Sequence, residues 1–510
     1  MAAPQMHSGI TTDDSMNLAM SPGAVPLYEA VIAFIKNEID PVTDEYFKLG
    51  QGRPDRWQYG KGQLELLESI KSKAKANGLW NFFLPNSETG QGLSNLDYAY
   101  IAAELGKNPI ASECLNCSAP DTGNMEVLER VGTPEQKKKW LEPLLNGEIR
   151  SAYAMTEPDV ASSDPKNLEC RAVLDGDEWL INGEKFYISG AGDPRCKILI
   201  CMLLTSPDGP PHGRHSQILV PMDTPGVEIV GAMHVFGEDD APHGHMHLRF
   251  TDVRVPKSNM LLGEGRGFEI SQVRLGPGRI HHCMRSIGAA ERALELMVRR
   301  GLNREAFGKP IARLGKNTEV IGKARIEIEA MRLMVLRAAR AMDTMGNAEA
   351  RVWVSAVKAM VPERVCKIID DAMQVFGATG ISQWTPLARM YAGQRTLRLA
   401  DGPDEVHWHV VGRAELARHE EAPYASEKIR QNQKGANNGS CSKHIWSRTD
   451  VKHRLWSQGG PDTCSICFAP WQPSVYHHRR RGQCRRRGQT DHRCFDNRRH
   501  EVASVRPSFA

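Results

Sequence analysis

Apolar residues recur at helical spacing from residue 24 to about residue 150. One face of the first predicted helix carries Leu27, Ala30, Val31, Phe34 and Ile35, the pattern of a helix that packs on a core. Thr133 followed by Pro134 is typical of a helix N-cap with proline at the first helical position. We therefore predict an N-terminal helical domain over residues 24–150. Residues 1–23 lack this spacing, and we expect them to form a disordered leader.

The period of the pattern changes after residue 150. Short apolar runs, such as residues 198–204 and 248–255, are separated by turn dipeptides such as Asp175-Gly176 and Asn182-Gly183. Regular spacing of this kind is typical of an antiparallel β barrel or sandwich. We therefore predict a middle β domain over residues 151–265.

Helical spacing returns from residue 266. Apolar residues step by three and four over residues 317–345, and further helical patterns cover residues 351–376 and 403–418. These patterns predict a C-terminal helical domain over residues 266–420. The order of helices, β unit and helices indicates a multidomain fold of the α+β class.

The last 90 residues differ from the rest of the chain. Residues 421–510 hold 17 Lys and Arg against 7 Asp and Glu, although the whole chain has a net charge of only +4. They have no apolar period and are rich in Arg, His, Gln, Gly and Ser, so we expect a disordered basic tail. The tail resembles a frame-shift or gene-model artefact, with a lineage-specific extension as the alternative. No aromatic stacking platform accompanies its Arg runs, so we expect no specific nucleic-acid partner.

The composition limits the compartments in which we expect the protein to function. No run of about 18 apolar residues exists, so we expect no integral membrane segment. The seven cysteines before residue 421 suggest reduced, intracellular thiols rather than a disulfide framework. The N-terminus carries no recognisable targeting signal. We expect an intracellular protein, mitochondrial or peroxisomal in a eukaryote and cytoplasmic in a bacterium.

Two stretches about 240 residues apart hold candidate chemistry. Residues 153–163 combine small residues with the hydroxyls of Thr156, Ser162 and Ser163, which could approach a phosphorylated cofactor. A polar connecting loop is the alternative. In the second stretch Asp401 precedes Gly402-Pro403, and a turn Asp is ordinarily solvated. In a desolvated cleft the same carboxylate could remove a carbon-bound proton.

A third motif is the Gly276-Pro277-Gly278 segment. It predicts that the chain is interrupted just before a helix begins, so that Arg279 and the histidines after it would lie at the helix start. Positive side chains beside free backbone N–H groups there would favour binding of a phosphate or a thioester carbonyl. A capped turn with a surface Arg is the alternative. The adjacent His281 and His282 would point apart on a helix and lack further ligands, so we predict no metal site.

Together these motifs resemble the acyl-CoA dehydrogenase family, and within it the branch called family members 10 and 11. The resemblance covers roughly residues 25–420 and rests on Met155-Thr-Glu-Pro158, Ile181-Asn-Gly-Glu-Lys185, the Leu275 to Arg285 segment, Arg304-Glu-Ala-Phe-Gly-Lys309, Gln374-Val-Phe-Gly-Ala378 and the Asp401 turn. It implies a C-terminal four-helix bundle and an FAD held between this bundle and the β domain. A neighbouring subunit would complete the site in a homodimer or a dimer of dimers.

The resemblance also implies roles for individual residues. The flavin and its pyrophosphate would be lined by Tyr153, Met155, Thr156, Ser162 and Ser163, and the isoalloxazine ring would be flanked by Tyr187, Ile188 and Ser189. The partner subunit's FAD would be reached by Arg304, Phe307, Gln374, Val375, Phe376, Gly377 and Ala378. The adenosine would be touched by Pro403, Asp404 and Glu405. The acyl-CoA would be faced by Ser163, Gly278, Arg279, Ile280, His281 and Gly402.

The implied reaction is α,β-dehydrogenation of an acyl-CoA in fatty-acid β-oxidation. Asp401 would abstract the α-proton while flavin N5 accepts the β-hydride, and an electron-transfer flavoprotein would take the electrons. Much of the family uses Glu as the base, so Asp401 reaches one methylene less. An acyl-CoA oxidase is an alternative, although its extra C-terminal domain and peroxisomal tripeptide are missing. A second alternative is a non-catalytic interaction protein that works through its basic tail.

Overall fold

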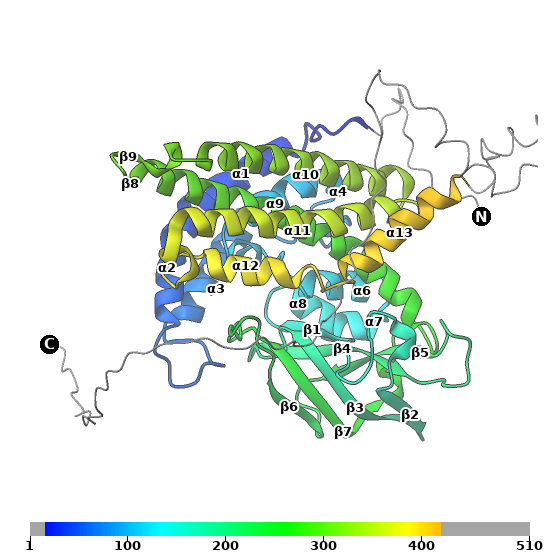
Figure 1. The fold of residues 1–510 in the computed structure, drawn as a ribbon. Helices are drawn as coiled ribbons and strands as arrows, with labels where there is room; N and C mark the ends of the chain where they lie inside the picture. The colour runs from blue at the N-terminus through cyan, green and yellow to red at the C-terminus, as the bar shows by residue number, and fades with distance from the viewer. Residues whose placement is uncertain (1–15, 420–510) are drawn as a thin grey trace, which may run out of the picture. The chain divides into compact units, whose positions relative to one another are not determined.

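Residues 16–419 are described by a computed structural model of the chain, apart from the side chains of residues 273, 275 and 277 (Figure 1). Within residues 16–419, Ser21 N donates to Asp97 Oδ1 at 2.8 Å and the Tyr100 hydroxyl donates to Leu18 O at 2.6 Å. The prediction of a disordered leader is therefore wrong for residues 16–23. The remaining leader and the predicted basic tail lie outside the described residues.

The N-terminal part is helical. Its helices are α1 (Val25–Phe34), which continues through a π-helical turn (Ile35–Ile39) into α2 (Asp40–Leu49), then α3 (Gln63–Ala76), α4 (Asn95–Leu105), α5 (Ala111–Cys114), α6 (Asp121–Val131), α7 (Pro134–Gln136) and, after a second π-helical turn (Lys137–Leu141), α8 (Glu142–Leu145). At the start of α7, Thr133 Oγ1 accepts from Gln136 N at 3.3 Å, and the Gln136 side chain accepts from Thr133 N at 3.0 Å. This reciprocal pair is a capping box and confirms the predicted cap.

The middle part is a sheet. Its strands are β1 (Arg150–Ala154), β2 (Arg171–Asp175), β3 (Glu178–Ser189), β4 (Cys196–Leu204), β5 (His215–Pro221), β6 (Val227–Ala232) and β7 (His245–Pro256). The strand order is β1-β4-β2-β3-β7-β6, with β5 paired to β4. Most pairs are antiparallel, as predicted, but β1 and β4 run parallel, as does the short β2–β4 pairing. The expectation of a wholly antiparallel sheet is wrong there. The connection from β1 to β4 contains β2 and β3 and is long enough for the chain to return in the same direction.

The C-terminal part returns to helices. Its elements are α9 (Gly267–Asn303), the short hairpin β8 (Glu305–Ala306) and β9 (Lys309–Pro310), then α10 (Asn317–Met345), α11 (Arg351–Phe376), α12 (Leu387–Thr396) and α13 (Asp404–Ala417). The predicted helices over residues 317–345 and 351–376 are confirmed. Figure 1 shows α9, α10 and α11 running side by side with α1 and α4 above the sheet.

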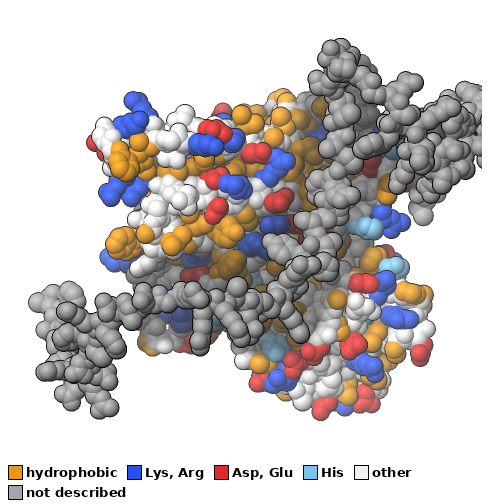
Figure 2. Space-filling view, in the orientation of Figure 1, with side chains coloured by type: hydrophobic (Ala, Val, Ile, Leu, Met, Phe, Trp, Pro, Cys, Tyr) orange, Lys and Arg blue, Asp and Glu red, His pale blue; other side chains and the backbone are white. Residues whose placement is uncertain are grey.

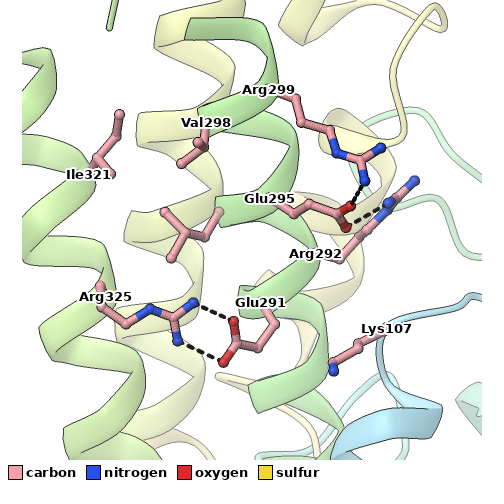
Figure 3. A pocket seen from close by; sticks show the side chains of 9 residues that line it. Lys107, Glu291, Arg292, Glu295, Val298, Arg299, Ile321 and Arg325 are labelled. Carbon is pink, nitrogen blue, oxygen red and sulfur yellow. Dashed lines mark hydrogen bonds and ion pairs between the residues drawn. The ribbon is translucent and has the colours of Figure 1, made fainter. Parts of the chain in front are cut away.

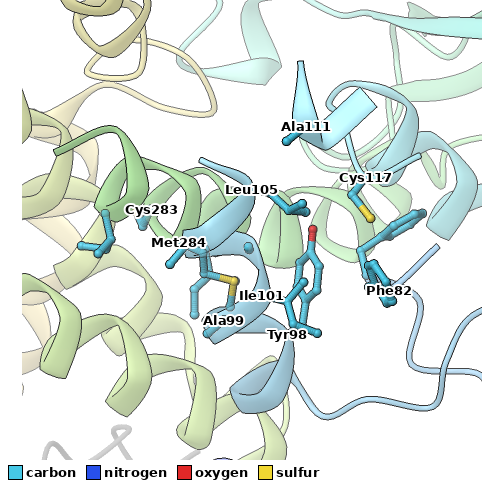
Figure 4. Packing of buried hydrophobic residues seen from close by; sticks show 14 of the residues in the cluster. Phe82, Tyr98, Ala99, Ile101, Leu105, Ala111, Cys117, Cys283 and Met284 are labelled. Carbon is cyan, nitrogen blue, oxygen red and sulfur yellow. The ribbon is translucent and has the colours of Figure 1, made fainter. Parts of the chain in front are cut away.

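The helical parts share one hydrophobic core, and the sheet has a second core of its own. Figure 4 shows the contact of α4 with α9, where Tyr98, Ile101 and Leu105 lie near Met284. The outer surface carries charges of both signs (Figure 2), for example the pair of Arg325 and Glu329 on α10 at 2.8 Å. Among residues 16–419, no helix combines the length and the apolar character that crossing a membrane requires.

Helix α9 corrects one prediction. It begins at Gly267 and continues without interruption through residues 276–278, so no break precedes Arg279. A proline inside a helix costs about 3 kcal/mol. After this point α9 buries Ile280, Met284 and Ile287 against the neighbouring helices, and each such side chain contributes about 1.5–3 kcal/mol. Arg279 therefore lies inside a helix, where free backbone N–H groups are not available to bind an anion.

Candidate active site

Asp401 lies in the turn between α12 and α13, with a positive φ of 56°. Three helices hold the backbone of this turn. Arg279 Nε on α9 donates to Asp401 O at 3.0 Å, and His407 Nε2 on α13 lies 3.2 Å from the same oxygen. Lys358 on α11 donates to Leu397 O and, at 3.3 Å, to Gly402 O. A non-glycine residue at positive φ is strained, so these contacts are what keep the carboxylate in place.

The Asp401 carboxylate faces α9. His282 Nε2 lies 3.4 Å from Asp401 Oδ2, and Arg274 Nη1 lies 3.9 Å from Asp401 Oδ1. A Cβ added to Gly278 would lie 3.4 Å from Asp401 Oδ2. Arg274, Gly278 and His282 are spaced by four residues and therefore occupy one face of the helix.

Opposing effects act on the protonation of Asp401. Burial raises the pKa of Asp401, but the hydrogen bond from His282 and the charges of Arg274 and Arg279 outweigh it and hold the pKa well below its usual range. Burial also lowers the pKa of His282, more than its contact with Asp401 raises it. Because an arginine stays charged at any working pH, the two arginines keep Asp401 ionised. An ionised carboxylate is the form that a general base needs.

Arg274 connects Asp401 to the start of the 153–163 stretch. Its guanidinium carbon lies 4.0 Å from the centroid of the Tyr153 ring, a cation–π contact. The Tyr153 hydroxyl accepts a hydrogen bond from Gln217 Nε2 at 3.0 Å and shares one of 2.9 Å with Ser271 Oγ. Two stretches that are distant in the sequence therefore meet at a single arginine.

Residues 155–163 form a loop fixed by a buried ion pair. Lys185 Nζ bonds Glu157 Oε1 at 2.7 Å and also donates to Met155 O at 2.9 Å and Met202 O at 2.6 Å. The Glu157 carboxylate accepts in addition from the backbone N–H groups of Glu169 and Cys170. All three ammonium protons of Lys185 are thus used inside the protein, as a fully buried charge requires.

Two of the hydroxyls of this loop already take part in hydrogen bonds within the protein. Thr156 Oγ1 donates to Phe186 O at 2.6 Å, so only its lone pairs remain for a ligand. Ser162 Oγ accepts from Glu157 N at 2.9 Å. Ser163 is exposed.

Strand β3 ends in an irregular segment. Its pairing with β7 shifts between Lys185 and Ile188, and Tyr187 has a positive φ of 54°. The Tyr187 side chain is 44% exposed, whereas Ile188 points into the sheet core. Ser189 Oγ lies 2.8 Å from His245 Nδ1. Bulges and strained residues are concentrated at functional sites, and an open aromatic ring beside a hydroxyl suits a planar cofactor.

Comparison with known proteins identifies the family. The descriptions "Acyl-CoA dehydrogenase, N-terminal domain", "middle domain" and "C-terminal domain" match residues 25–148, 152–253 and 265–416. The mouse proteins named acyl-CoA dehydrogenase family members 10 and 11 are 50% and 51% identical to this chain, over 78% and 75% of its length. The matched parts cover 37% and 49% of those relatives.

One solved structure agrees with this result. A Mycobacterium abscessus protein described as an acyl-CoA dehydrogenase has 49% identity and a TM-score of 0.75, over 79% of this chain and 100% of its own. The chain belongs to the acyl-CoA dehydrogenase family. The predicted fold class, with two helical parts around a β domain, is confirmed. The prediction of FAD as the cofactor is confirmed with it.

Two groups of residues predicted to bind FAD lie far from Asp401. Arg304 is the C-cap residue of α9 and Phe307 lies in the turn of the β8–β9 hairpin, at the opposite end of the helical layer from α13 (Figure 1). Phe307 is 95% exposed and has a positive φ of 50°. Gln374 to Phe376 end α11, and Gly377 and Ala378 follow in a short 3-10 helix. A single chain does not bring these residues to the Asp401 turn.

The remaining predicted residues have mixed surroundings. Asp404 is buried and accepts from Arg398 Nε at 2.6 Å, while Glu405 is exposed and Pro403 is the N-cap residue of α13. Ile280 is buried in the helical core. His281 points away from Asp401, and its ring centroid lies 4.9 Å from that of Tyr98.

The sequence predictions missed several residues near Asp401. Arg274, Lys358 and His407 were not assigned to the site, and His282 was considered beside Arg279 and as a metal ligand but not as a partner of Asp401. A signal existed for two of them, because Arg274 and His282 lie four residues before and after the predicted Gly278 on one helical face. Lys358 and His407 come from other helices, and their spacing along the chain gives no comparable signal.

A surface cleft of about 650 Å³ lies between α9 and α10 (Figure 3). Its charged groups are paired with one another, as in Arg325 with Glu291 at 2.8 Å and Arg299 with Glu295 at 2.6 Å. None of the residues that contact Asp401 lines it. The cleft is therefore separate from the candidate active site.

Proposed function

We propose that this protein oxidises an acyl-CoA thioester to the trans-2-enoyl-CoA in fatty-acid β-oxidation, with Asp401 as the base. The observation that carries the proposal is the position of Arg274, 3.9 Å from the Asp401 carboxylate and 4.0 Å from the Tyr153 ring. It links an ionised carboxylate to the segment assigned to the flavin. Removal of an α-proton beside a hydride acceptor needs these two elements together.

Asp401 removes the α-proton of the thioester. Gly278 leaves the neighbouring side of the carboxylate open, since a Cβ there would already touch Oδ2 at 3.4 Å. Asp401 binds a proton weakly, because Arg274 and Arg279 favour its ionised form. The thioester must therefore be acidified in the site, and preorganised N–H donors at its carbonyl oxygen are the usual means.

The residues of β3 and the 153–163 stretch fit a flavin. The Tyr187 ring is exposed on a strained backbone, and the Thr156 hydroxyl offers lone pairs because its proton is used on Phe186 O. When bound, FAD supplies the hydride acceptor. The protein holds the cofactor and keeps water from the reacting carbons.

We propose a homodimer, or a dimer of two such dimers, in which Arg304 and Phe307 reach the partner subunit's FAD. The almost complete exposure of the Phe307 ring is compatible with this arrangement, because the ring is free to contact a second subunit. An electron-transfer flavoprotein is the proposed electron acceptor, on the family resemblance.

The test is the absorption spectrum of the purified protein. We expect bound flavin that bleaches when an acyl-CoA is added without oxygen, and an enoyl-CoA as the product. Absence of flavin, or flavin that no acyl-CoA bleaches, would contradict the proposal. Rapid oxygen consumption with peroxide formation would favour an acyl-CoA oxidase instead.

A further inference from the structure

Ser189 and His245 face each other across two strands. They are register partners on β3 and β7, and Ser189 Oγ lies 2.8 Å from His245 Nδ1. Tyr187, which is exposed, and Ser189 flank the buried Ile188 at the end of β3. The proposed reaction gives His245 no role.

The backbone around this pair is tightly fixed. Gly190 N donates to Gly244 O at 2.9 Å, and Gly192 N donates to His243 O at 3.1 Å. A Cβ added to Gly244 would lie 2.6 Å from the Trp57 ring, so the backbone at residue 244 packs closely against this ring. The backbones that carry Ser189 and His245 are therefore held next to each other by the fold.

His245 is neutral at neutral pH. Burial lowers its pKa and the nearby His243 lowers it further, against the attraction of Asp240. Asp240 is itself engaged by Arg389 of α12 at 2.7 Å. A neutral imidazole has one nitrogen that accepts a hydrogen bond and one that donates. With the proton on Nε2, Nδ1 accepts from the Ser189 hydroxyl.

We propose that His245 is a positioning residue that fixes the direction of the Ser189 hydroxyl toward the flavin ring. The inference rests on the proposed function, which assigns Tyr187 to Ser189 to that ring. When Ser189 donates its proton to His245, it presents an oxygen lone pair to the cofactor. In the reduced ring, flavin N5 would carry a hydrogen that this lone pair can accept in a hydrogen bond. In the oxidised ring, N5 is itself an acceptor. The lone pair therefore favours the reduced ring over the oxidised ring. His245 thus raises the midpoint potential of the bound flavin.

The experiment measures the midpoint potential and the dissociation constant of FAD in the purified holoprotein. For His245→Leu we expect the ratio of the affinities for reduced and oxidised FAD to fall tenfold. This change lowers the midpoint potential by about 30 mV for a two-electron couple. His245→Asn should stay near the unmodified protein, because its amide oxygen can occupy the place of Nδ1. His247→Gln is the matched control, since His247 lies on the same strand but bonds Glu184 at 2.6 Å.

A double-substitution cycle makes the test specific. Ser189→Ala should lower the potential as His245→Leu does, and combining them should add nothing further. If His245→Leu does not fold, His245→Gln takes its place, since its longer side chain does not reproduce Nδ1. The proposal is overturned if these His245 variants match His247→Gln, or if the two substitutions are additive. Absence of flavin from the unmodified protein would instead refute the proposed function.

Discussion

Arg274 Nη1 lies 3.9 Å from Asp401 Oδ1. This contact joins a helix of the C-terminal part to the turn that carries the proposed base, and the same guanidinium stacks on Tyr153. Arg274 therefore affects both the charge of the base and the start of the flavin segment.

Replacing Arg274 should change the pH dependence of the reaction. Because the pKa of Asp401 is depressed, the base stays ionised as the pH falls, and kcat/KM should show no loss from Asp401 protonation between pH 8 and pH 5. Arg274→Gln removes a charge that lowers the pKa of Asp401, while burial continues to raise that pKa. The acid limb of the kcat/KM profile should therefore move up by about one pH unit or more. Arg292→Gln, a surface residue of the same helix paired with Glu295, is the control. An unchanged acid limb in Arg274→Gln would show that other charges set the pKa.

Gly402 should not tolerate a side chain. Its φ is +102°, and a Cβ would lie 3.0 Å from His407 Nε2. Gly402→Ala should therefore lower the free energy of unfolding by about 1–2 kcal/mol and reduce kcat, because the Asp401 turn must shift. Gly393→Ala is a matched control in α12, where a Cβ meets nothing within 4 Å, and it should be neutral or stabilising. Chemical denaturation and steady-state kinetics check both variants.

The buried pair of Lys185 and Glu157 should be essential for the flavin loop. Lys185→Met leaves the Glu157 carboxylate buried without its counter-ion, at a cost of about 3–5 kcal/mol. It also removes the donor to Met155 O, so FAD should bind more weakly. Lys323→Met, which breaks an exposed pair on α10, should change neither property. Equal stability and FAD affinity in Lys185→Met would contradict the role of this pair.

Glu126 should make stability depend on pH. Burial raises the pKa of this α6 carboxyl to about 8, so the folded protein holds a proton that the unfolded chain loses near pH 4.5. Stability is then lost as the pH rises from about 4.5 to about 8, by up to about 5 kcal/mol. Glu126→Gln removes this loss and should raise the melting temperature at pH 9 relative to the unmodified protein, with little difference at pH 4. Equal differences at the two pH values would contradict the assignment.

Much of the fold could be predicted from local patterns. Helices α10 and α11 follow their apolar spacing closely because each buries a continuous stripe. The predicted break before Arg279 failed, because packing of α9 against distant helices outweighs the local cost of proline. Strand β1 has few large apolar residues and pairs in parallel with a strand some 45 residues later, so its local sequence does not reveal it.

The candidate site likewise contains residues that the local sequence predicts and residues that it does not predict. Asp401 could be predicted from its turn and from the family motifs around it. Its partners could not, because they depend on which faces of α9, α11 and α13 meet at the turn. His245 is equally hidden, since only the register of β3 and β7 places it against Ser189.

Asp401→Asn tests the central claim most directly. Asparagine keeps nearly the same size but cannot accept the α-proton, so the variant should keep its FAD while bleaching by acyl-CoA falls by several orders of magnitude. Chemical reduction by dithionite should remain normal and serves as the control for a reducible flavin. The measurement is the anaerobic bleaching rate after rapid mixing of each protein with acyl-CoA. Loss of bleaching with retained FAD is the predicted result, and bleaching at the unmodified rate would contradict the account.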